Sequence, residues 1–222
     1  MYREHEYWGK PLPSFGDPNA ELLVLGLAPA AHGGNRTGRM FTGDRSGDFL
    51  YRALYDAGFA NQAESRHRGD GLKLRNCYIT AALRCAPPKN KPRPQELRNC
   101  RPYLEREFEL LKSVRAVLAL GRIAFDTYLR LIYQGREGLR NPAASRHGDA
   151  VNQPPGVRMA PAVLPPRSSF HFAHGESYAL PGGWPRLFAS YHPSQQNTQT
   201  GRLTPEMMQQ VLYDIRKFLD AN

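Results

Sequence analysis

Four short apolar runs alternate with amphipathic stretches along this chain, and that alternation limits the folds open to it. The first run, ELLVLGL, is nearly continuous, as is typical of a strand covered on both faces. Strands that alternate with helices predict an α/β domain: a three-layer α/β/α arrangement around a central, mostly parallel four-stranded sheet. The predicted strands cover 21–27, 76–83, 114–121 and 186–191, and the predicted helices cover 46–59, 93–112, 121–132 and 204–221.

Polar residues and prolines mark the expected ends of these helices. Ser46 is the expected N-cap of the first helix. Thr204, followed by Pro205 and Glu206, is the expected cap of the last. Pro102 lies within the second helix and is expected to kink or split it.

Length and charge bound the class of protein. The 222 residues predict one domain over 1–222, with a flexible insertion at 135–169, where Pro, Gly, Arg and Ser predominate. The 30 basic residues outnumber the 20 acidic ones, and the net charge of +10 favours a nucleic-acid partner. The sequence has neither a membrane-spanning run nor the apolar core of a signal peptide, which predicts a cytoplasmic protein without a membrane partner.

Three of the predicted strands run into loops of unusual composition, at 28–45, 84–93 and 192–203. The carboxyl ends of parallel strands meet at one edge of the sheet, and ligands bind beyond that edge. We therefore expect these loops to form a single site. Taken singly, each could instead be a solvated connector.

The first loop, within 26–44, has glycines that let backbone N–H groups approach an anion, and arginines that add charge. It matches neither the P-loop pattern nor GxGxxG. In the second loop Arg84, Lys89, Lys91 and Arg93 alternate with prolines, which suits a phosphate backbone. In the third, His192 directly follows a strand and could donate a hydrogen bond to an oxyanion; the alternative is a structural histidine.

Together these segments resemble the motifs of uracil-DNA glycosylases, most closely the family 5 branch of bacteria and archaea. The resemblance covers nearly the whole chain except 135–169, and it rests on GLAPAAHGGNRTGRMFTGD, TAALRCAPPKNKP, FAHG and SYHPSQQNTQTGRLT. It implies a monofunctional DNA repair enzyme that flips a damaged nucleotide out of duplex DNA and hydrolyses its N-glycosidic bond. The bond breaks through an oxocarbenium-like sugar and leaves an anionic base.

The resemblance also implies roles for individual residues. Asp44 would orient the water or stabilise the cationic sugar, His192 would donate to uracil O2, and Phe41 would stack on the flipped base. Helix capping is the alternative for Asp44, and core packing for Phe41. Leu203 and its neighbours would form the wedge that fills the vacated stack. The expected base pocket comprises Gly26, Ala28, Asn35, Phe41 and Ala82, and the expected DNA contacts comprise Arg36, Arg39, Lys89, Lys91, Asn197 and Arg202.

Two departures from other branches of the superfamily bear on specificity. The tetrapeptide 26–29 has no polar side chain, which fits family 5 and turns attention to Asp44. The second strand ends in Thr80-Ala81-Ala82, where several other branches carry an asparagine that reads the uracil edge. Because that asparagine is absent, we expect looser base selection, with activity on hypoxanthine and other deaminated bases.

The resemblance further implies a 4Fe-4S cluster on four cysteines, two of which match Cys85 and Cys100. The other two belong to an N-terminal Cys-x-x-Cys, which this chain lacks, and Cys77 matches no ligand. The cluster is therefore expected to be absent or incomplete here. A start codon assigned too late would explain the missing segment; the alternative is a lineage that has lost the cluster.

Two rival functions remain open. A DNA-binding protein without catalytic activity would bind DNA in a salt-sensitive way and leave no abasic product. A nucleotide hydrolase would need a cluster of metal-binding acids, and the loops offer only Asp44 and Asp48. The expected partner is double-stranded DNA, and single-stranded DNA as well, bound by a monomer.

Overall fold

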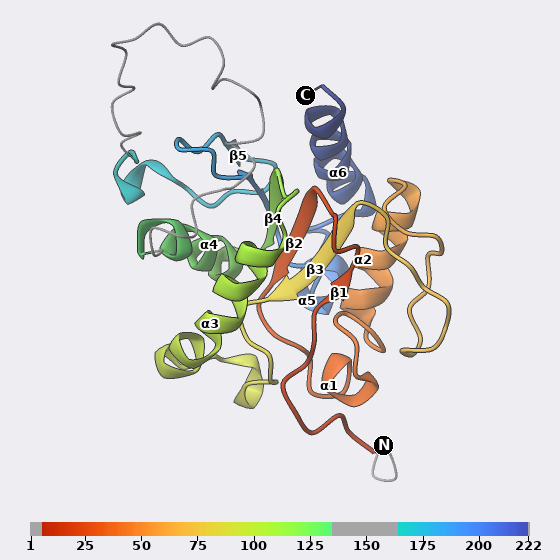
Figure 1. The fold of residues 1–222 in the computed structure, drawn as a ribbon. Helices are drawn as coiled ribbons and strands as arrows, with labels where there is room; N and C mark the ends of the chain where they lie inside the picture. The colour runs from red at the N-terminus through yellow and green to blue at the C-terminus, as the bar shows by residue number, and fades with distance from the viewer. Residues whose placement is uncertain (1–5, 135–163, 222) are drawn as a thin grey trace, which may run out of the picture.

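The computed structural model describes residues 6–134 and 164–221, which form a six-stranded sheet between two layers of helices (Figure 1). The strand order is β1-β3-β2-β4-β6-β5. The central four strands are parallel, and the two edge strands are antiparallel to their neighbours. The strands are β1 (Phe15–Gly16), β2 (Leu22–Gly26), β3 (Cys77–Ala81), β4 (Ala116–Leu120), β5 (Ser177–Tyr178) and β6 (Arg186–Ser190).

The predicted α/β fold is confirmed, but the predicted number of strands is wrong. The four predicted strands are the parallel centre of the sheet, and β1 and β5 extend it at both edges. Each edge strand has two residues, which is too short to produce an alternating pattern in the sequence.

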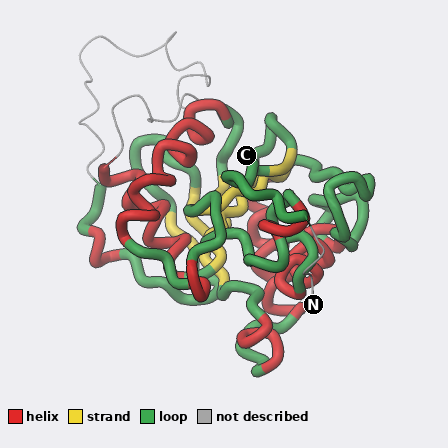
Figure 2. Tube along the Cα trace, turned by 90° about the horizontal axis from the view of Figure 1, so that it is seen from below, coloured by secondary structure: helices red, strands yellow, loops and turns green. Residues whose placement is uncertain are grey.

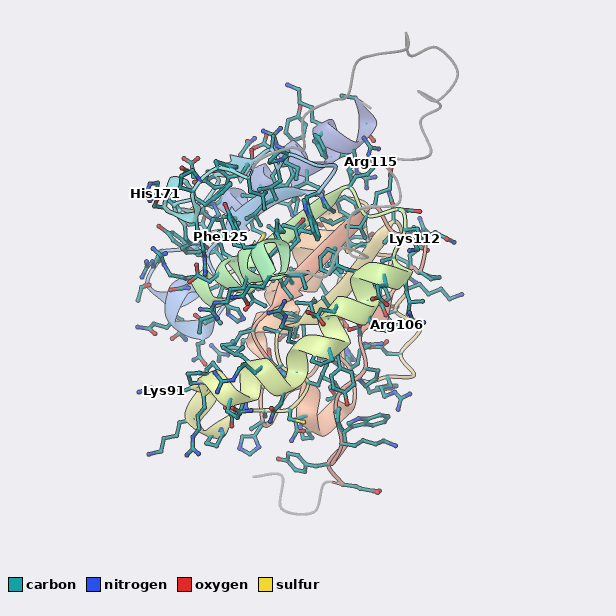
Figure 3. The ribbon with its side chains drawn as sticks, turned by 60° about the vertical axis from the view of Figure 1, so that its left-hand side comes forward. Lys91, Arg106, Lys112, Arg115, Phe125 and His171 are labelled. Carbon is teal, nitrogen blue, oxygen red and sulfur yellow. The ribbon has the colours of Figure 1, made fainter. Side chains whose placement is uncertain are left out.

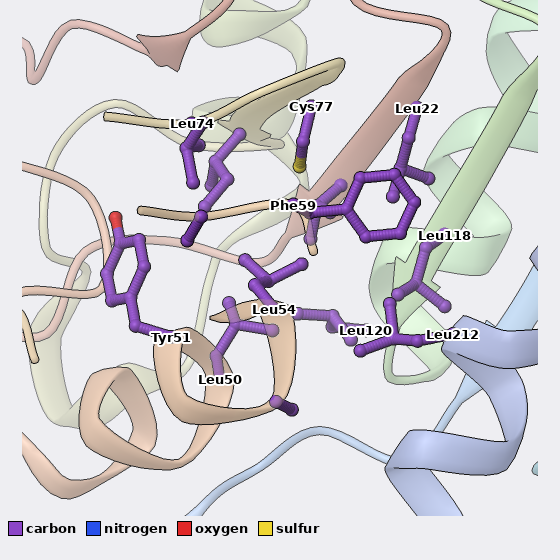
Figure 4. Packing of buried hydrophobic residues seen from close by; sticks show 14 of the residues in the cluster. Leu22, Leu50, Tyr51, Leu54, Phe59, Leu74, Cys77, Leu118, Leu120 and Leu212 are labelled. Atoms are coloured by element: carbon purple, nitrogen blue, oxygen red, sulfur yellow. The ribbon is translucent and has the colours of Figure 1, made fainter. Parts of the chain in front are cut away.

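Helices cover both faces of the sheet and create two apolar cores. On one face, α2 (Arg45–Asp56) and α6 (Pro205–Asp220) pack against Leu22 and Val24 of β2 (Figure 4). On the other face, α3 (Pro94–Leu110) and α4 (Arg122–Gln134) pack against Leu23 and Leu25. Alternate side chains of a strand point to opposite faces, so a fully apolar β2 serves both cores.

The helix ends agree with the sequence at one cap and differ at another. Thr204 caps α6, since its Oγ accepts a hydrogen bond from the Met207 N–H at 3.3 Å. The predicted cap Ser46 is wrong: Asp44 caps α2, and its Oδ1 accepts from the Gly47 N–H at 3.0 Å. α3 continues through Pro102 as one helix, with Leu104 and Phe108 buried beyond it.

Four short elements lie in segments that were predicted as loops: α1 (Gly34–Thr37), α5 (Gln195–Gln199) and the 3-10 turns η1 (Pro88–Asn90) and η4 (Arg167–Ser169). Most of the predicted insertion, 135–163, lies outside the described residues. Among the described residues, no helix combines the length and apolar character that a membrane span requires.

Candidate active site

The four parallel strands end at one edge of the sheet, because their registers are aligned. Gly26 is paired with Ala81, and Leu120 with Ser190. The segments that follow the strands therefore gather at the lower edge in Figure 1, and Figure 2 shows the loops across that edge from below. This confirms that the predicted loops share one edge.

The Asp44 carboxylate has one oxygen committed to structure and one available. Oδ1 caps α2, while Oδ2 accepts no hydrogen bond within the described part of the chain. The carboxylate lies directly against Gly33, where an added Cβ would come within 2.0 Å of Oδ2. Capping thus fixes the carboxylate, and glycine makes room for it. The capping alternative is therefore observed, while the catalytic role of Asp44 stays a prediction.

Phe41 lies beside the end of β2 in an unusual backbone conformation. Its φ is +51°, which is uncommon for a residue other than glycine and is typical of strained functional positions. A Cβ at Gly26 would lie 2.9 Å from Cζ of the Phe41 ring, so the ring covers the strand end. The Phe41 ring is also 6.0 Å from the His192 ring, centroid to centroid.

His192 is half-buried, and hydrogen bonds to its backbone carbonyl hold it in place. Its carbonyl oxygen accepts from the Asn197 side-chain amide at 2.8 Å and from the Ser194 N–H at 2.7 Å. Burial lowers the pKa of His192, while the negative charge of Asp44 acts in the opposite direction. The imidazole is therefore neutral near pH 7, and a neutral imidazole has one N–H to donate.

The remaining predicted base-pocket residues differ in their surroundings. Asn35 is half-buried at the start of α1, and no hydrogen bond engages its side-chain amide within the described residues. Ala28 is half-buried next to the end of β2. Ala82 is buried; its N–H donates to the Gly26 carbonyl at 3.0 Å, and it also lines a groove of about 420 Å³ between α3 and α4.

Thr80, two residues before Ala82, has a structural role. Its hydroxyl donates to Glu107 at 2.6 Å and accepts from Ser14 at 3.0 Å. Glu107 also forms an ion pair with Arg84 at 2.6 Å, in which Arg84 has 5 % of its side chain exposed. Arg84 therefore does not belong to the basic track predicted for 84–93, because burial keeps it from a phosphate backbone.

Arg39 likewise has a structural role, which replaces the DNA contact expected for it. Its guanidinium forms a bidentate ion pair with Asp70, at 2.8 and 2.6 Å, with only 4 % and 7 % of the two side chains exposed. It also donates to Thr42 and Ser65. This network joins the loop 61–73 to the loop that carries Phe41 and Asp44.

The other predicted DNA contacts lie at the surface or are partly engaged. Lys89 lies within η1 and Lys91 directly follows it, and both are exposed. Arg202 is exposed, with its guanidinium 4.6 Å from the centroid of the Tyr191 ring. Arg36 crosses the first loop and donates to the carbonyls of His32 and Gly43. Asn197 supports His192, as described above, which gives it a positioning role.

The predicted wedge residue Leu203 is wrong for that role. It is 1 % exposed and belongs to the core under α2 and α6. An apolar residue at a loop end can serve as a wedge or close a core, and the sequence pattern does not distinguish the two.

The N-terminal segment also builds the site, and sequence reasoning did not foresee it. The Trp8 N–H donates to the Asn35 carbonyl at 3.0 Å, and the Tyr7 hydroxyl bonds to Nδ1 of His32 at 2.6 Å. Leu12 N–H donates to the carbonyl of Arg84 at 2.7 Å. The aromatic residues in EYWGK were the only signal that this segment packs against something.

The residues present do not fit a four-thiolate cluster. Burial raises the pKa of the Cys85 thiol, and the charge of Cys100 acts in the same direction. Cys77 is buried within β3, and the chain has three cysteines in all. Among the described residues, no group of three or more His, Cys, Asp or Glu side chains could hold a metal ion.

Comparison with known proteins identifies the family. A model of the uracil DNA glycosylase superfamily matches residues 13–216. A type-5 uracil-DNA glycosylase of Thermus thermophilus is 48% identical over 216 residues, which is 97% of this chain and 84% of the relative. The chain belongs to the type-5 uracil-DNA glycosylases.

Other relatives agree with this placement. A type-5 uracil-DNA glycosylase of Pyrobaculum aerophilum is 43% identical over 95% of this chain and 77% of its own length. A type-4 uracil-DNA glycosylase of the same organism is 31% identical over 61% of each chain. The resemblance to family 5 is thus confirmed, and the family is one of glycosidic-bond hydrolases. The match from 13 to 216 includes Asp44, Phe41 and His192.

Proposed function

We propose that this type-5 uracil-DNA glycosylase excises uracil from duplex DNA, with Asp44 and His192 as its catalytic residues. The observation that carries the proposal is their arrangement at the carboxyl edge of the sheet. Asp44 is electrostatically coupled to His192, and Phe41 lies beside His192. The base would have to leave the stack to reach this edge, because the sugar–base bond is shielded within a duplex.

His192 would stabilise the departing base. As the N-glycosidic bond breaks, the bonding electrons move onto the base, and negative charge develops on O2. A neutral imidazole held through its backbone carbonyl can donate its N–H to that oxygen without giving up a full proton. Removal of one such donor typically costs about 100- to 1,000-fold in rate.

Asp44 would act on the sugar side of the same bond. Its uncommitted Oδ2 can orient a water toward C1′ and stabilise the positive charge that develops on the sugar. The water then adds to C1′ and gives up one proton, which passes by way of the Asp44 carboxylate or solvent to the base anion, so the products are the neutral free base and an abasic site. Phe41 would stack on the flipped base.

The same site would accept hypoxanthine. Thr80 is bonded to Glu107, and Ala81 and Ala82 have no polar side-chain atoms, so the end of β3 offers no amide that selects the uracil edge. Selection would then rest on stacking and on the His192 contact, which tolerate a purine. We extend the proposal to single-stranded DNA, to a monomeric enzyme and to a cytoplasmic location with the nucleoid.

The decisive experiment is a cleavage assay on a labelled duplex with one central uracil, followed by alkali. Asp44→Asn and His192→Gln should each lower the single-turnover rate by at least about 100-fold. Asp56→Asn is the matched control, because Asp56 is an exposed carboxylate at the far end of α2, in a surface ion pair with Arg52. A duplex with hypoxanthine in place of uracil tests the wider specificity.

Each outcome of this assay has a distinct meaning. Tight binding without any abasic product from the wild-type chain would favour the DNA-binding protein without catalysis. Full activity in Asp44→Asn would remove Asp44 from the mechanism. Cleavage of uracil with hypoxanthine left intact would refute the wider specificity alone.

A further inference from the structure

Two cations stack on one aromatic ring of the N-terminal segment, the indole of Trp8. The Lys10 Nζ lies 4.7 Å from the centroid of the Trp8 ring, and the Arg68 guanidinium lies 4.4 Å from it. Both cations are exposed, whereas Trp8 is half-buried. The stack therefore presents two positive charges to solvent at fixed positions.

This stack rests directly on the loop that carries the catalytic aspartate. A Cβ at Gly38 would lie 2.8 Å from the Trp8 ring and 2.7 Å from Cδ of Arg68, so both side chains press against the end of α1. The backbone N–H of Trp8 donates to the carbonyl of Asn35, and its indole Nε1 donates to the carbonyl of Pro11 at 3.3 Å. Trp8 is thus fixed both through its backbone N–H and through its indole nitrogen.

Arg68 is also held in place by the turn on which it lies. It occupies a turn that Asp70 closes, because the Asp70 carboxylate accepts from the backbone N–H groups of Arg66 and His67. Asp70 is in turn fixed by the buried Arg39. The position of Arg68 is therefore tied to the loop of Asp44 through Arg39 as well as through Gly38.

In the part of the chain that the structure describes, neither cation has an acidic partner. Within 6–134 and 164–221, Lys10 and Arg68 form no ion pair, in contrast to the buried Arg39 and Arg84. Stacking on Trp8 restricts their motion. Among the same described residues, no carboxylate neutralises their charge and no hydrogen bond engages their side chains. Two such cations at fixed positions suit an anion outside the chain.

We propose that Lys10 and Arg68 form a phosphate-binding site for the DNA backbone, distinct from the basic track at Lys89 and Lys91. The inference rests on the proposed function for the choice of DNA as the polyanion. Figure 1 shows the N-terminal segment and α1 at the lower edge, where the segment between β3 and α3 also lies. A duplex laid over the strand ends would meet both sites, and the one on Trp8 would fix the DNA relative to Asp44.

The test is the salt dependence of binding to an undamaged, fluorescein-labelled duplex of about 30 base pairs. Each phosphate contact contributes about 0.9 to the slope of log K against log salt. The double variant Lys10→Ala with Arg68→Ala should therefore reduce the steepness of that slope by about 1.8 relative to the unaltered chain. Lys10→Met with Arg68→Gln keeps the apolar stems on Trp8 and should reduce it equally, which separates charge from packing.

The matched control removes the same two charge types far from the strand ends. Arg106 and Lys112 are exposed near the end of α3 that is opposite to Lys91 (Figure 3). Arg106→Ala with Lys112→Ala should leave the slope unchanged. An unchanged slope in both Lys10/Arg68 variants, or an equal loss in the control, would overturn the proposal.

This readout is independent of catalysis. If the wild-type chain failed to excise uracil while the slope still fell in the Lys10/Arg68 variants, the phosphate site would stand and the proposed reaction would fail. If excision succeeded and the slope did not change, the proposed reaction would stand and the phosphate site would fail. An acidic protein as the true partner would appear as the second of these outcomes.

Discussion

At the scale of single residues, Asp44 and His192 are coupled through charge. Burial lowers the pKa of His192, and the Asp44 carboxylate partly opposes that shift. Asp44→Asn removes the opposing charge, so the His192 pKa should fall further below 6.5. The measurement is an NMR titration of the imidazole signals.

His174 provides an internal control in the same titration. Burial lowers its pKa too, but Asp44 is not among the groups that act on it. Its pKa should therefore stay constant when Asp44 is neutralised. Equal movement of both pKa values would indicate a general structural change, and an unchanged His192 pKa would show that the charge of Asp44 does not act on His192.

Gly33 should be as sensitive to substitution as the proposed catalytic residues, although it takes no chemical part. Gly33→Ala would place a methyl group within 2.0 Å of the Asp44 Oδ2, so the carboxylate must move. We expect a loss of about 100-fold in the single-turnover rate, since small displacements of a catalytic group are costly. Gly69→Ala is a control, because its added Cβ would meet only the His67 ring, at 3.7 Å and beyond, which is ordinary van der Waals contact.

The expected effect at Gly33 illustrates which roles of single residues can be predicted from the sequence. The motif resemblance singled out Asp44 and His192, because residue types at fixed spacing carry chemistry. It could not assign a task to Gly33, because the contact with Asp44 depends on the path of the loop through space. The same limit explains Arg39 and Asn197, whose polar side chains looked exposed in a glycine-rich or amide-rich segment.

At the scale of elements, the buried ion pair of Arg39 and Asp70 joins the loop 61–73 to the loop that carries Asp44. Burial acts to raise the Asp70 pKa, but hydrogen bonds from Arg39 and from backbone N–H groups outweigh it and hold the pKa well below its usual range. The stabilisation is present above the unfolded pKa of about 3.9 and is lost as the pH falls below it.

Asp70→Asn should lower the free energy of unfolding by about 3 to 5 kcal/mol at pH 7, because a buried guanidinium loses its counter-charge. Urea unfolding at pH 7 measures the change, and repetition at pH 3 should give a smaller difference. Glu64→Gln, in an exposed pair with Arg66, is the control and should have little effect. A loss of similar size for Glu64 would contradict this account.

Element prediction succeeded where the sequence shows a clear period. The four parallel strands and the helices α2, α3, α4 and α6 each bury a continuous face, and the corresponding pattern is visible in the sequence. The elements β1, β5, α1 and α5 are two to five residues long. Their existence depends on neighbours in space, which no local pattern encodes.

At the scale of the whole molecule, the sequence predicted one site because parallel strands must end at the same edge. It did not predict that residues 7–12 pack across that edge. The contacts of Trp8 with Asn35 and of Leu12 with Arg84 join segments far apart in the chain. They involve single backbone hydrogen bonds and an aromatic ring, which leave no period to read.

The net charge of +10 is a property of the whole chain, but only cations that face DNA release counterions on binding. Lys89, Lys91, Arg202, Lys10 and Arg68 are the exposed cations that we place against the backbone. About five contacts predict a slope of roughly −4.5 in log K against log salt. Fluorescence anisotropy between about 50 and 200 mM salt measures it. Uracil-containing and undamaged duplexes should share this slope, because phosphates are the same in both; a slope near −9 would instead mean that the net charge acts as a whole.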